Sequence, residues 1–504
     1  MNRNSLKSQS GSNMSAFFTV LFVFVIALAM VAPAHAQFTL VKISNDSFHN
    51  ASSQHKTEVE PDTYSWGSTM VAAFQVARVA GGGGADLGFS TSTDGGKTWT
   101  FGSLPGWTVN FKHGTASAAS DASVVYDAKH KVWLIEGLPL SNAGVNVAVS
   151  RSTDGIHWGN PIVVDGNEVD DKNWITCDNT PTSRFYGNCY AEWDQAFSTG
   201  LIQMSTSHDG GLTWSPAVGT ADQAGGSGAE PLVLPNGTVV VPYLGFNMQG
   251  FTSTDGGKTW GSSFNIANVN TFQGNSSLRS VGLPFPSTGI DKAGKLYVVW
   301  SDCSFRSGCS TNDLVMSTST NGTKWTLPAR IPIDALSSTV DHFIPGLAVD
   351  RATSGKTAHL TATYYFYPQA NCDDSSCRVH VGFTTSSDGG KTWTAGKDLG
   401  AGAMQIGWLP NSQNGPMLAD YLSSSYVNGK AFGVFMVAKA PSGGLFNQAA
   451  YTTKQPLEAS AGELRFSSRG EKRIPNVHSD RPFPRTQGEE RESPASPPNR
   501  SLNK

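Results

Sequence analysis

The stretch STDGGKTW, residues 92–99, decides the fold because it recurs along the chain. The same eight letters return at 253–260, looser copies stand at 207–214 and 386–393, and shortened copies stand at 152–158 and 319–325. In each copy an Asp or Asn precedes glycine, which suits a tight turn: the side-chain oxygen accepts backbone N–H bonds, and glycine adopts positive φ at no steric cost. Each copy therefore predicts a turn between two strands, with its final Trp packed between sheets.

The spacing of the copies predicts the architecture. Their Asp or Asn positions are 60, 55, 46, 66 and 67 residues apart, the length of a four-stranded propeller blade with one long loop. A strand–turn–strand pattern precedes each copy, and a seventh pattern at 415–439 has no copy after it. The stretch FTLVKIS (38–44) can supply its missing outer strand. The sequence thus predicts an all-β propeller, seven-bladed in preference to six, whose ring is closed by the N-terminal strand.

The two ends of the chain differ from its body. An apolar run at 16–36 follows Arg3 and Lys7 and ends in small-x-small residues, which predicts a signal peptide over residues 1–36 and a secreted or periplasmic protein. No membrane span would remain after cleavage, although an uncleaved anchor helix is the alternative. Residues 37–455 form the predicted propeller. Residues 456–504, rich in Pro and Arg, have little apolar periodicity and are predicted to be a disordered tail.

Charge and cysteine content narrow the possible partners. The chain has a net charge of −3, and residues 37–455 carry 25 Lys and Arg against 32 Asp and Glu, which argues against a nucleic-acid partner. Six cysteines in an exported chain predict three local disulfides: Cys177 with Cys189, Cys303 with Cys309, and Cys372 with Cys377. A zinc site is the alternative interpretation of the cysteines, but no C-x-x-C motif and no histidine pair stands at the spacing of zinc ligands. One carboxylate per turn is too few for calcium, so we expect no metal and no cofactor.

The repeated phrase S-x-D-x-G-x-x-W is the Asp-box, or BNR repeat. With blade-length spacing, the chain resembles the sialidase superfamily across roughly residues 38–455. The stretch DDKNWITCDNTPTSRFYGNCYAEWD (170–194) is also similar to a segment common in secreted bacterial sialidase-like proteins. The resemblance implies the propeller fold. It says less about activity, since non-enzymatic propellers use the same box.

Candidate site residues stand where the innermost strand of each blade is expected to begin. In a propeller these starts lie at the face that carries ligands, and the box turns lie at the opposite face. The starts are mostly charged: Glu60, Asp121, Asp171 with Lys172, Glu230, Arg279, Asp341 with His342, and Asp420 with Tyr421. We expect their carboxylates to converge at a channel mouth, where crowding raises some pKa values. Alternatively, these acids tie blades together through backbone hydrogen bonds.

The resemblance implies a role for each residue. Sialidases typically use three arginines, a Tyr and Glu pair, and an Asp acid. Carried over, Tyr421 is the nucleophile, Glu230 its base and Asp121 the acid, and the substrate-binding residues are Arg279, Glu60, Asp171 and Asp341. However, Arg279 is the only arginine expected to begin an inner strand. Glu230 and Arg279 begin consecutive inner strands, so we expect them to meet and expect weak activity on sialosides.

Three function classes follow. The first is a secreted, monomeric, sialidase-like exo-glycosidase acting on a glycan or glycoconjugate. The second is an acid-pair glycosidase on neutral glycans, in which two of the carboxylates do the chemistry. The third is a non-catalytic propeller that binds a glycan or protein through exposed aromatic residues: Trp66, Trp107, Trp174 and Trp408.

Overall fold

The computed structural model describes residues 1, 38–166, 169–196, 198–459 and 462–474. The chain divides into two units, Met1–Gln37 and Phe38–Lys504, and the strands lie in the second. Residues 2–36 of the predicted signal peptide, and residues 460–461 and 475–504 of the predicted tail, lie outside the described residues. Among the described residues, no helix has the length and apolar character needed to cross a membrane.

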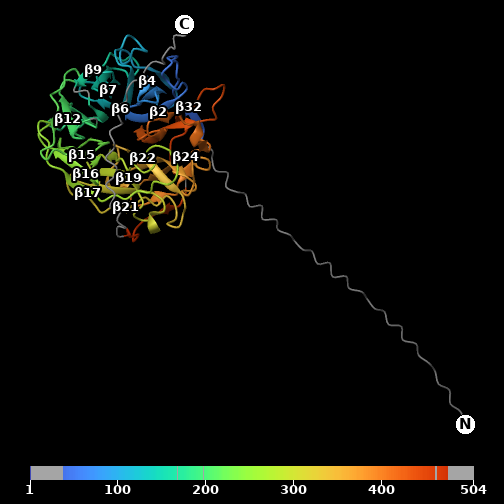
Figure 1. Ribbon diagram of the computed structural model, residues 1–504. Coiled ribbons are helices and arrows are strands. Elements are labelled where there is room, and N and C mark those ends of the chain that lie inside the picture. Colours follow the sequence, from blue (N-terminus) through green and yellow to red (C-terminus); the bar gives the residue numbers. More distant parts are fainter. Residues whose placement is uncertain (2–37, 167–168, 197, 460–461, 475–504) are drawn as a thin grey trace, which may run out of the picture. The chain divides into compact units, whose positions relative to one another are not determined.

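The second unit is built from antiparallel meanders that follow one another along the chain (Figure 1). The first two meanders are joined into one sheet by a single pairing between Gly84 and Ala119. Their strands are β2 (Glu58–Trp66), β3 (Thr69–Arg78), β4 (Gly84–Ser92), β5 (Thr100–Ser103), β6 (Ala118–Asp127), β7 (Val132–Leu140), β8 (Val147–Ser152) and β9 (Ile162–Asp165).

Four further meanders form separate sheets. They comprise β10 (Asp171–Cys177), β11 (Cys189–Asp194), β12 (Ile202–Ser207) and β13 (Val218–Gly219); β14 (Leu232–Val233), β15 (Val239–Leu244), β16 (Met248–Ser253) and β17 (Phe264–Ala267); β18 (Ser287–Ile290), β19 (Leu296–Asp302), β20 (Asp313–Ser319) and β21 (Ala329–Arg330); and β22 (Asp341–Val349), β23 (Leu360–Tyr367), β24 (Arg378–Ser386), β26 (Lys397–Asp398) and β27 (Met404–Gln405).

The last meander takes its fourth strand from the other end of the second unit. It consists of β30 (Ser423–Val427), β31 (Lys430–Ala438), β32 (Gln448–Thr453) and β1 (Leu40–Lys42). Strand β1 pairs with β32 in antiparallel register, Leu40 opposite Thr453 and Lys42 opposite Tyr451. The short elements are β25 (Trp393–Thr394) paired with β33 (Arg465–Phe466), β28 (Asn411–Ser412) paired with β29 (Gly415–Pro416), and the 3₁₀ helices η1 (Ser307–Cys309), η2 (Gly355–Thr357) and η3 (Ile406–Trp408).

The first strands of neighbouring meanders are linked by polar side chains. A side-chain oxygen on one strand accepts the backbone N–H of the next, so backbone groups facing the neighbour are satisfied. These links join Asp62 to Val124 at 2.7 Å, Ser123 to Ile175 at 3.4 Å, Glu230 to Thr288 at 2.7 Å and Ser287 to Leu347 at 2.9 Å. On β30, Ser423 Oγ donates to the Thr63 carbonyl of β2 at 3.2 Å. Of the candidate acids at the expected strand starts, Glu230 makes a link of this kind.

Four first strands contain a bulge at the same place. The bulged residues have positive φ although none is glycine: Glu60 (53°), Asp121 (49°), Lys172 (46°) and Ile344 (50°). The pairing register shifts across each of these positions. Such bulges turn a side chain away from its ordinary strand direction and are common beside functional sites. Three of the four present a charged side chain.

Each Asp-box forms the predicted turn between the third and fourth strands of its meander. In the first copy, Asp94 Oδ1 accepts the backbone N–H groups of Lys97 and Thr98 at 3.0 Å each, and Oδ2 accepts the Thr98 hydroxyl at 2.7 Å. The hydroxyl and N–H of Thr98 hold the pKa of Asp94 well below its usual range. In three copies the Trp Nε1 donates back to a glycine carbonyl of the turn, which latches the hairpin.

The three predicted disulfides are present and local. Cys177–Cys189 joins directly opposed residues of β10 and β11, the first two strands of the third meander, as expected. Cys303–Cys309 spans the connection from β19 to β20, and Cys372–Cys377 spans the connection from β23 to β24. No cysteine is left free.

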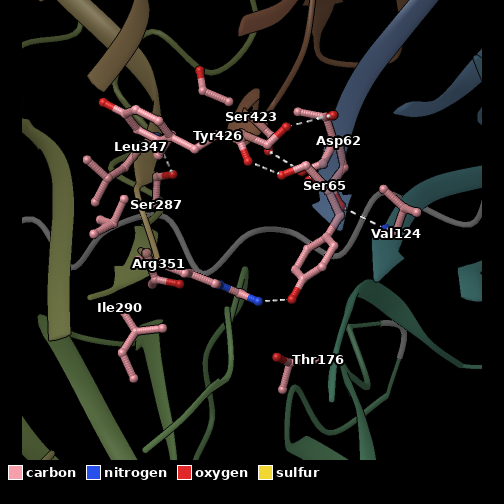
Figure 2. Close-up of a pocket in the computed structure, with 18 of the residues that line it drawn as sticks. Asp62, Ser65, Val124, Thr176, Ser287, Ile290, Leu347, Arg351, Ser423 and Tyr426 are labelled. Carbon is pink, nitrogen blue, oxygen red and sulfur yellow. Dashed lines mark hydrogen bonds between the residues drawn. The ribbon is translucent and has the colours of Figure 1, made fainter. Parts of the chain in front are cut away.

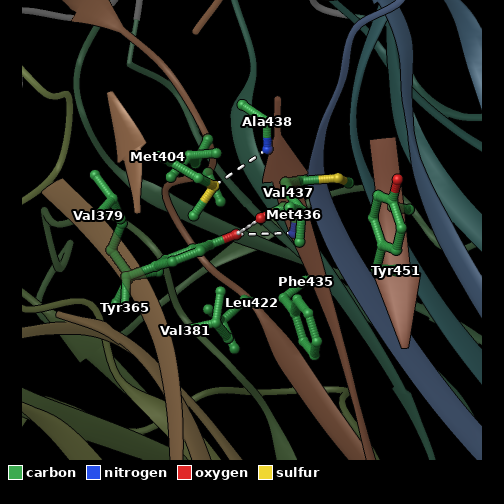
Figure 3. Close-up of a cluster of buried hydrophobic side chains, with 14 of the residues drawn as sticks. Tyr365, Val379, Val381, Met404, Leu422, Phe435, Met436, Val437, Ala438 and Tyr451 are labelled. Carbon is green, nitrogen blue, oxygen red and sulfur yellow. Dashed lines mark hydrogen bonds between the residues drawn. The ribbon is translucent and has the colours of Figure 1, made fainter. Parts of the chain in front are cut away.

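The largest hydrophobic cluster packs the last two meanders together (Figure 3). Tyr365 of β23 lies at its centre, where its hydroxyl donates to the Met436 carbonyl at 3.1 Å and accepts the Met436 N–H at 2.8 Å. The Met404 sulfur accepts the Ala438 N–H at 3.1 Å. These polar contacts tie β31 to β23 and to β27 inside an otherwise apolar interior.

Residues 462–474, part of the expected disordered tail, make specific contacts. Strand β33 pairs with β25, and Glu471 receives two hydrogen bonds from Arg330, at 2.8 and 2.9 Å. Glu463 pairs with Lys397 at 2.5 Å, and Arg473 pairs with Asp302 at 3.1 Å. Ion pairs thus hold residues 462–474 against the strands. The sequence predicted disorder here because it lacks apolar periodicity, and ion pairs leave no such periodic pattern.

Candidate functional site

A buried charged cluster forms where the first strands of several meanders begin. It brings together Glu60, Asp121, Lys172, Arg279, Asp420 and Tyr421, each at most 8% exposed. Strand bulges turn three of these side chains toward one another, those of Glu60, Asp121 and Lys172. Of the six carboxylates expected to converge, Glu60, Asp121 and Asp420 therefore lie together.

Lys172 is the centre of this cluster. Its Nζ lies 2.8 Å from Asp420 Oδ2, 3.1 Å from Asp121 Oδ2 and 3.7 Å from Glu60 Oε1. Burial by itself lowers the pKa of Lys172, but Asp121, Asp420, Glu60 and Asp171 together outweigh it, and the net shift is upward. Lys172 therefore remains a cation. Sequence reasoning noted it only as the neighbour of Asp171, because nothing local predicts three carboxylate partners.

Asp420 holds Arg279 in a bidentate ion pair. Arg279 Nε and Nη2 donate to the two carboxylate oxygens of Asp420 at 2.8 and 2.6 Å, and the Ser280 hydroxyl donates to one of them. Burial raises the pKa of Asp420, but Arg279 and Lys172 lower it more, so the carboxylate stays ionised. Its oxygens are occupied by internal donors, which makes Asp420 a poor nucleophile.

Glu60 and Asp121 share a second set of partners. Gln75 Nε2 donates to Glu60 Oε2 and lies 3.0 Å from Ser120 Oγ, and Ser120 donates to Asp121 Oδ1 at 2.6 Å. Arg78 in turn donates to Gln75 Oε1 at 2.8 Å. Burial and the nearby Asp121 raise the pKa of Glu60 well above its usual range. Glu60 is thus the acid of this cluster most readily protonated near neutral pH.

Tyr421 lies beside these acids. Its ring meets Trp174 edge-on, with centroids 5.2 Å apart. Its hydroxyl is buried and has no hydrogen-bond partner among the described residues. Burial, followed by the charges of Asp121 and Glu60, raises the pKa of Tyr421 well above its usual range. The phenol is therefore neutral at ordinary pH, and it would need a base to act as a nucleophile.

A cavity of about 630 Å³ borders the cluster. Asp171, Lys172, Arg279 and Asp420 line it, together with Phe285 and residues of the 276–283 loop. Its size suits a small-molecule or sugar ligand. Three residues of the cluster, Lys172, Arg279 and Asp420, would contact a ligand in this cavity. Glu60 and Asp121 contact Lys172 but do not line the cavity.

Glu230 lies in a different place from the one expected. Its Oε2 accepts the Thr288 N–H, and the residue lines a second cavity together with Asp62. Burial raises its pKa well above the usual range. Arg279, which was expected to meet Glu230, is paired with Asp420 and lines the other cavity. The expectation was wrong because the two residues begin neighbouring strands at different heights: Glu230 precedes β14 by two residues, whereas Arg279 precedes β18 by eight.

Asp341 also has partners outside the Lys172 cluster. Its Oδ1 accepts the Asn312 backbone and side-chain N–H groups at 2.7 and 2.9 Å. Burial raises the pKa of Asp341 to about 7. These contacts give Asp341 a structural role between β20 and β22.

Two groups of side chains have metal-ligand proximity among the described residues. Asp127 lies near Cys177 and Cys189, but those sulfurs form a disulfide. Asp313, Asp334 and His342 lie together, but Arg306 donates to both aspartates, at 2.5 and 2.6 Å. The first group is thus committed to a disulfide, and the second lies within an ion-pair network that supplies a buried cation of its own.

The four candidate tryptophans differ in exposure. Trp107 is 1% exposed and its Nε1 donates to Ser150, so it packs within the sheets. Trp174 and Trp408 are half-buried. Trp66 is 37% exposed. Trp66 and Trp174 both line the second cavity.

No protein-family model and no curated protein sequence matches this chain. Solved structures with a related arrangement do exist. A protein of unknown function from Dyadobacter fermentans has 15% identity and a TM-score of 0.43, over 69% of this chain and 99% of that one. The NanB sialidase of Streptococcus pneumoniae has 13% identity and a TM-score of 0.41, over 83% and 70%. The intramolecular trans-sialidase of Ruminococcus gnavus has 14% identity and a TM-score of 0.39, over 86% and 99%. At this level of similarity, the function has to be inferred from the residues of this chain.

Proposed function

We propose that this protein is an exported, seven-bladed β-propeller that binds a neutral glycan in the cavity beside Lys172, Arg279 and Asp420. Seven meanders supply seven first strands, β2, β6, β10, β14, β18, β22 and β30, and the pairing of β1 with β32 supports closure of the ring. The apolar run before Gln37 and the three disulfides support export. Amino-terminal sequencing of the secreted protein should begin at Gln37.

The internal pairing of Arg279 is the observation that carries the choice of a neutral ligand. Asp420 already occupies its Nε and Nη2, so a carboxylate ligand would have to displace a bidentate, buried partner. Within the cluster, Lys172 and Arg279 are both paired with carboxyl groups, and Asp171 adds a further acid to the cavity lining. Both features disfavour a sialic acid carboxylate. Neutral sugar hydroxyls, in contrast, bind well to such fixed polar networks because they both donate and accept hydrogen bonds.

A glycan array probed with the purified, labelled protein tests this proposal. Neutral glycans should be bound in preference to sialylated ones, and Arg279→Gln should weaken that binding because it also releases Asp420. Asp94→Asn, in a turn away from the cavity lining, is the matched control and should bind like the wild type. Preferential binding of sialosides, or unaltered binding by Arg279→Gln, would contradict the proposal.

Hydrolysis of the bound glycan is the second candidate function. The observation that favours it is the raised pKa of Glu60, close to Lys172 and to the unpartnered hydroxyl of Tyr421. In this reading Tyr421 is the nucleophile, Asp121 is the acid, and Glu60 takes the role of base that the sequence suggested for Glu230. None of the three belongs to the described cavity lining, so this reading requires the reacting end of the glycan to reach past Lys172 toward them. Glu60 must first lose its own proton, so turnover should rise with pH.

A panel of chromogenic neutral glycosides and one sialoside tests hydrolysis. Glu60→Gln should lower the rate at least ~100-fold, as expected for loss of an acid–base group. Glu230→Gln, which alters the second cavity, should keep the wild-type rate. The opposite ranking of these two variants would return the role of base to Glu230, and no turnover of any glycoside would leave binding alone.

A further inference from the structure

A second cavity lies where the first strands end, and neither proposed function uses it. It has a volume of about 310 Å³ and is lined by the last residues of β2, by β18, by the end of β22 and by β30 (Figure 2). Its lining shares no residue with the cavity beside Lys172. This volume falls within the range of ordinary ligand sites.

An aromatic wall borders this cavity. Trp66 stacks on Tyr126 with centroids 5.3 Å apart and an interplanar angle of 29°, and Tyr126 packs on Trp133 at 4.9 Å. Trp133 then meets Tyr64 edge-on at 6.4 Å. Trp66 is the exposed end of this series and stays 37% accessible. A rigid, exposed indole supplies contact area with little loss of side-chain entropy on binding.

Arg351 reaches across the cavity to the same wall. Its guanidinium carbon lies 4.6 Å from the centroid of the Tyr64 ring, and Nη1 donates to the Tyr64 hydroxyl (Figure 2). Asn179 donates to the same hydroxyl at 3.2 Å. No carboxylate of the described chain lies within ion-pair distance of Arg351. Its planar group is therefore held in place by an aromatic ring, and its remaining N–H groups can serve a ligand.

The rest of the lining mixes polar residues with apolar ones such as Ile290 and Leu347, and it carries more acids than cations. Asp62, Glu230 and Asp350 line the cavity, and Arg351 is the one basic residue of its described lining. Hydroxyls of Ser65 and Ser423 bond to backbone carbonyls and fix the floor. Such a lining repels an anion and offers many hydrogen bonds to hydroxyl groups.

We propose that this cavity is a second saccharide site, which takes a neutral sugar stacked on Trp66 and hydrogen-bonded by Arg351. Trp174 lines the same cavity and packs on Tyr421 of the charged cluster, so one side chain lies between the two sites. The site would hold another part of a glycan, or a second glycan, independently of the cavity beside Lys172.

Calorimetric titration of the full mature chain tests the site with four probes: cellotriose, maltotriose, xylotriose and N,N′-diacetylchitobiose. At least one should bind the wild type, and Trp66→Ala should weaken it by roughly tenfold or more, the scale of one aromatic contact. Trp66→Phe, which keeps a ring, and Arg351→Lys, which keeps a charge, should lose less. Phe246→Ala removes an aromatic residue that is 72% exposed and belongs to neither cavity lining, and it should bind like the wild type.

The same titrations separate this site from the one beside Lys172. Binding that survives Arg279→Gln but falls with Trp66→Ala supports the second site even if the first proposal fails. Binding that falls only with Arg279→Gln overturns the second site and leaves the first proposal intact. A folded Trp66→Ala protein with wild-type affinity for every probe, or a wild type that binds none of the four, also overturns it.

Discussion

Replacement of Asp94 in the first Asp-box isolates the contribution of the turn, because the chain contains its own reference for the milder substitution. Asp94→Ala removes two backbone N–H contacts, at 3.0 Å each, and the hydroxyl contacts from Thr98 and Ser92, at 2.7 and 2.8 Å. Asp94→Asn keeps one acceptor oxygen. The fifth copy naturally has Asn321, whose Oδ1 accepts the N–H groups of Thr323 and Lys324 at 3.1 and 2.9 Å.

The expected loss follows from the exposure of this turn. Lys97 and Thr98 are exposed, so their N–H groups can bond to water in the Ala variant. The loss is then about 1–2 kcal/mol in total, at the low end for four hydrogen bonds. Asp94→Asn should cost about half as much, because it gives up mainly the Thr98 hydroxyl contact to the second oxygen. In a domain this large, such changes shift Tm by only a few degrees.

Equilibrium denaturation in guanidinium chloride, followed by Trp fluorescence, is therefore the better assay. The pH dependence of the stability difference gives a second test, because its direction can be predicted. The folded pKa of Asp94 is lowered from 3.8, so its stabilisation is present above pH 3.8 and is lost as the pH falls through the folded value. The difference between wild type and Asp94→Asn should accordingly narrow in acid.

The opposite pattern would refute a structural role for the box. If Asp94→Ala kept the wild-type free energy of unfolding but lost affinity for a glycan, the turn would belong to a binding site. Equal losses for the Ala and Asn variants would show that the backbone contacts contribute little.

Three further substitutions and one mapping experiment test other parts of the molecule. Lys172→Met should lower the free energy of unfolding by about 3–5 kcal/mol, since it leaves buried carboxylates without their shared cation, and the loss measured by denaturation should be greater at pH 9 than at pH 5. Glu58 is buried and its pKa is raised to about 8, so its favourable contribution is lost as pH rises from 4.5 to 8; Glu58→Gln should gain stability over wild type at pH 9 and none at pH 4, whereas the exposed Glu458→Gln should change neither value. Glu471→Ala should cost about 1 kcal/mol, because Arg330 keeps its two aspartate partners, and a wild-type denaturation curve would deny residues 462–474 a stabilising role. Non-reducing peptide mapping should return only the three local disulfides, and any long-range pair would contradict the structure.

Local patterns predicted much of the fold. A box turn is specified within eight residues, since its Asp or Asn, its glycines and its Ser or Thr hydroxyls bond to one another. The disulfides were predictable for the same reason: their separations are 12, 6 and 5 residues. The missing outer strand of the last meander was also readable, because a meander without a box needs a fourth strand from elsewhere.

The candidate site depended on contacts that no local pattern encodes. The residue types at the strand starts were visible, and most of those residues do converge. Their partners were not visible: Arg279 and Asp420 are 141 residues apart, and the positive φ of Glu60, Asp121 and Lys172 turns side chains that an ordinary strand would place differently. Glu230 was misassigned because it precedes its strand by two residues and Arg279 precedes its own by eight, and the sequence does not show where the regular strand begins.

The sequence by itself determined the turns, the strand periodicity and the local disulfides, because each of these is an interaction between residues close along the chain. Only the tertiary structure decided which acid meets which cation, that the Arg279 guanidinium is already paired, and that Trp66 and Arg351 face one cavity. Those properties depend on the relative height and rotation of strands from different meanders. Packing of all the sheets fixes these quantities together, so no single segment of the sequence contains them.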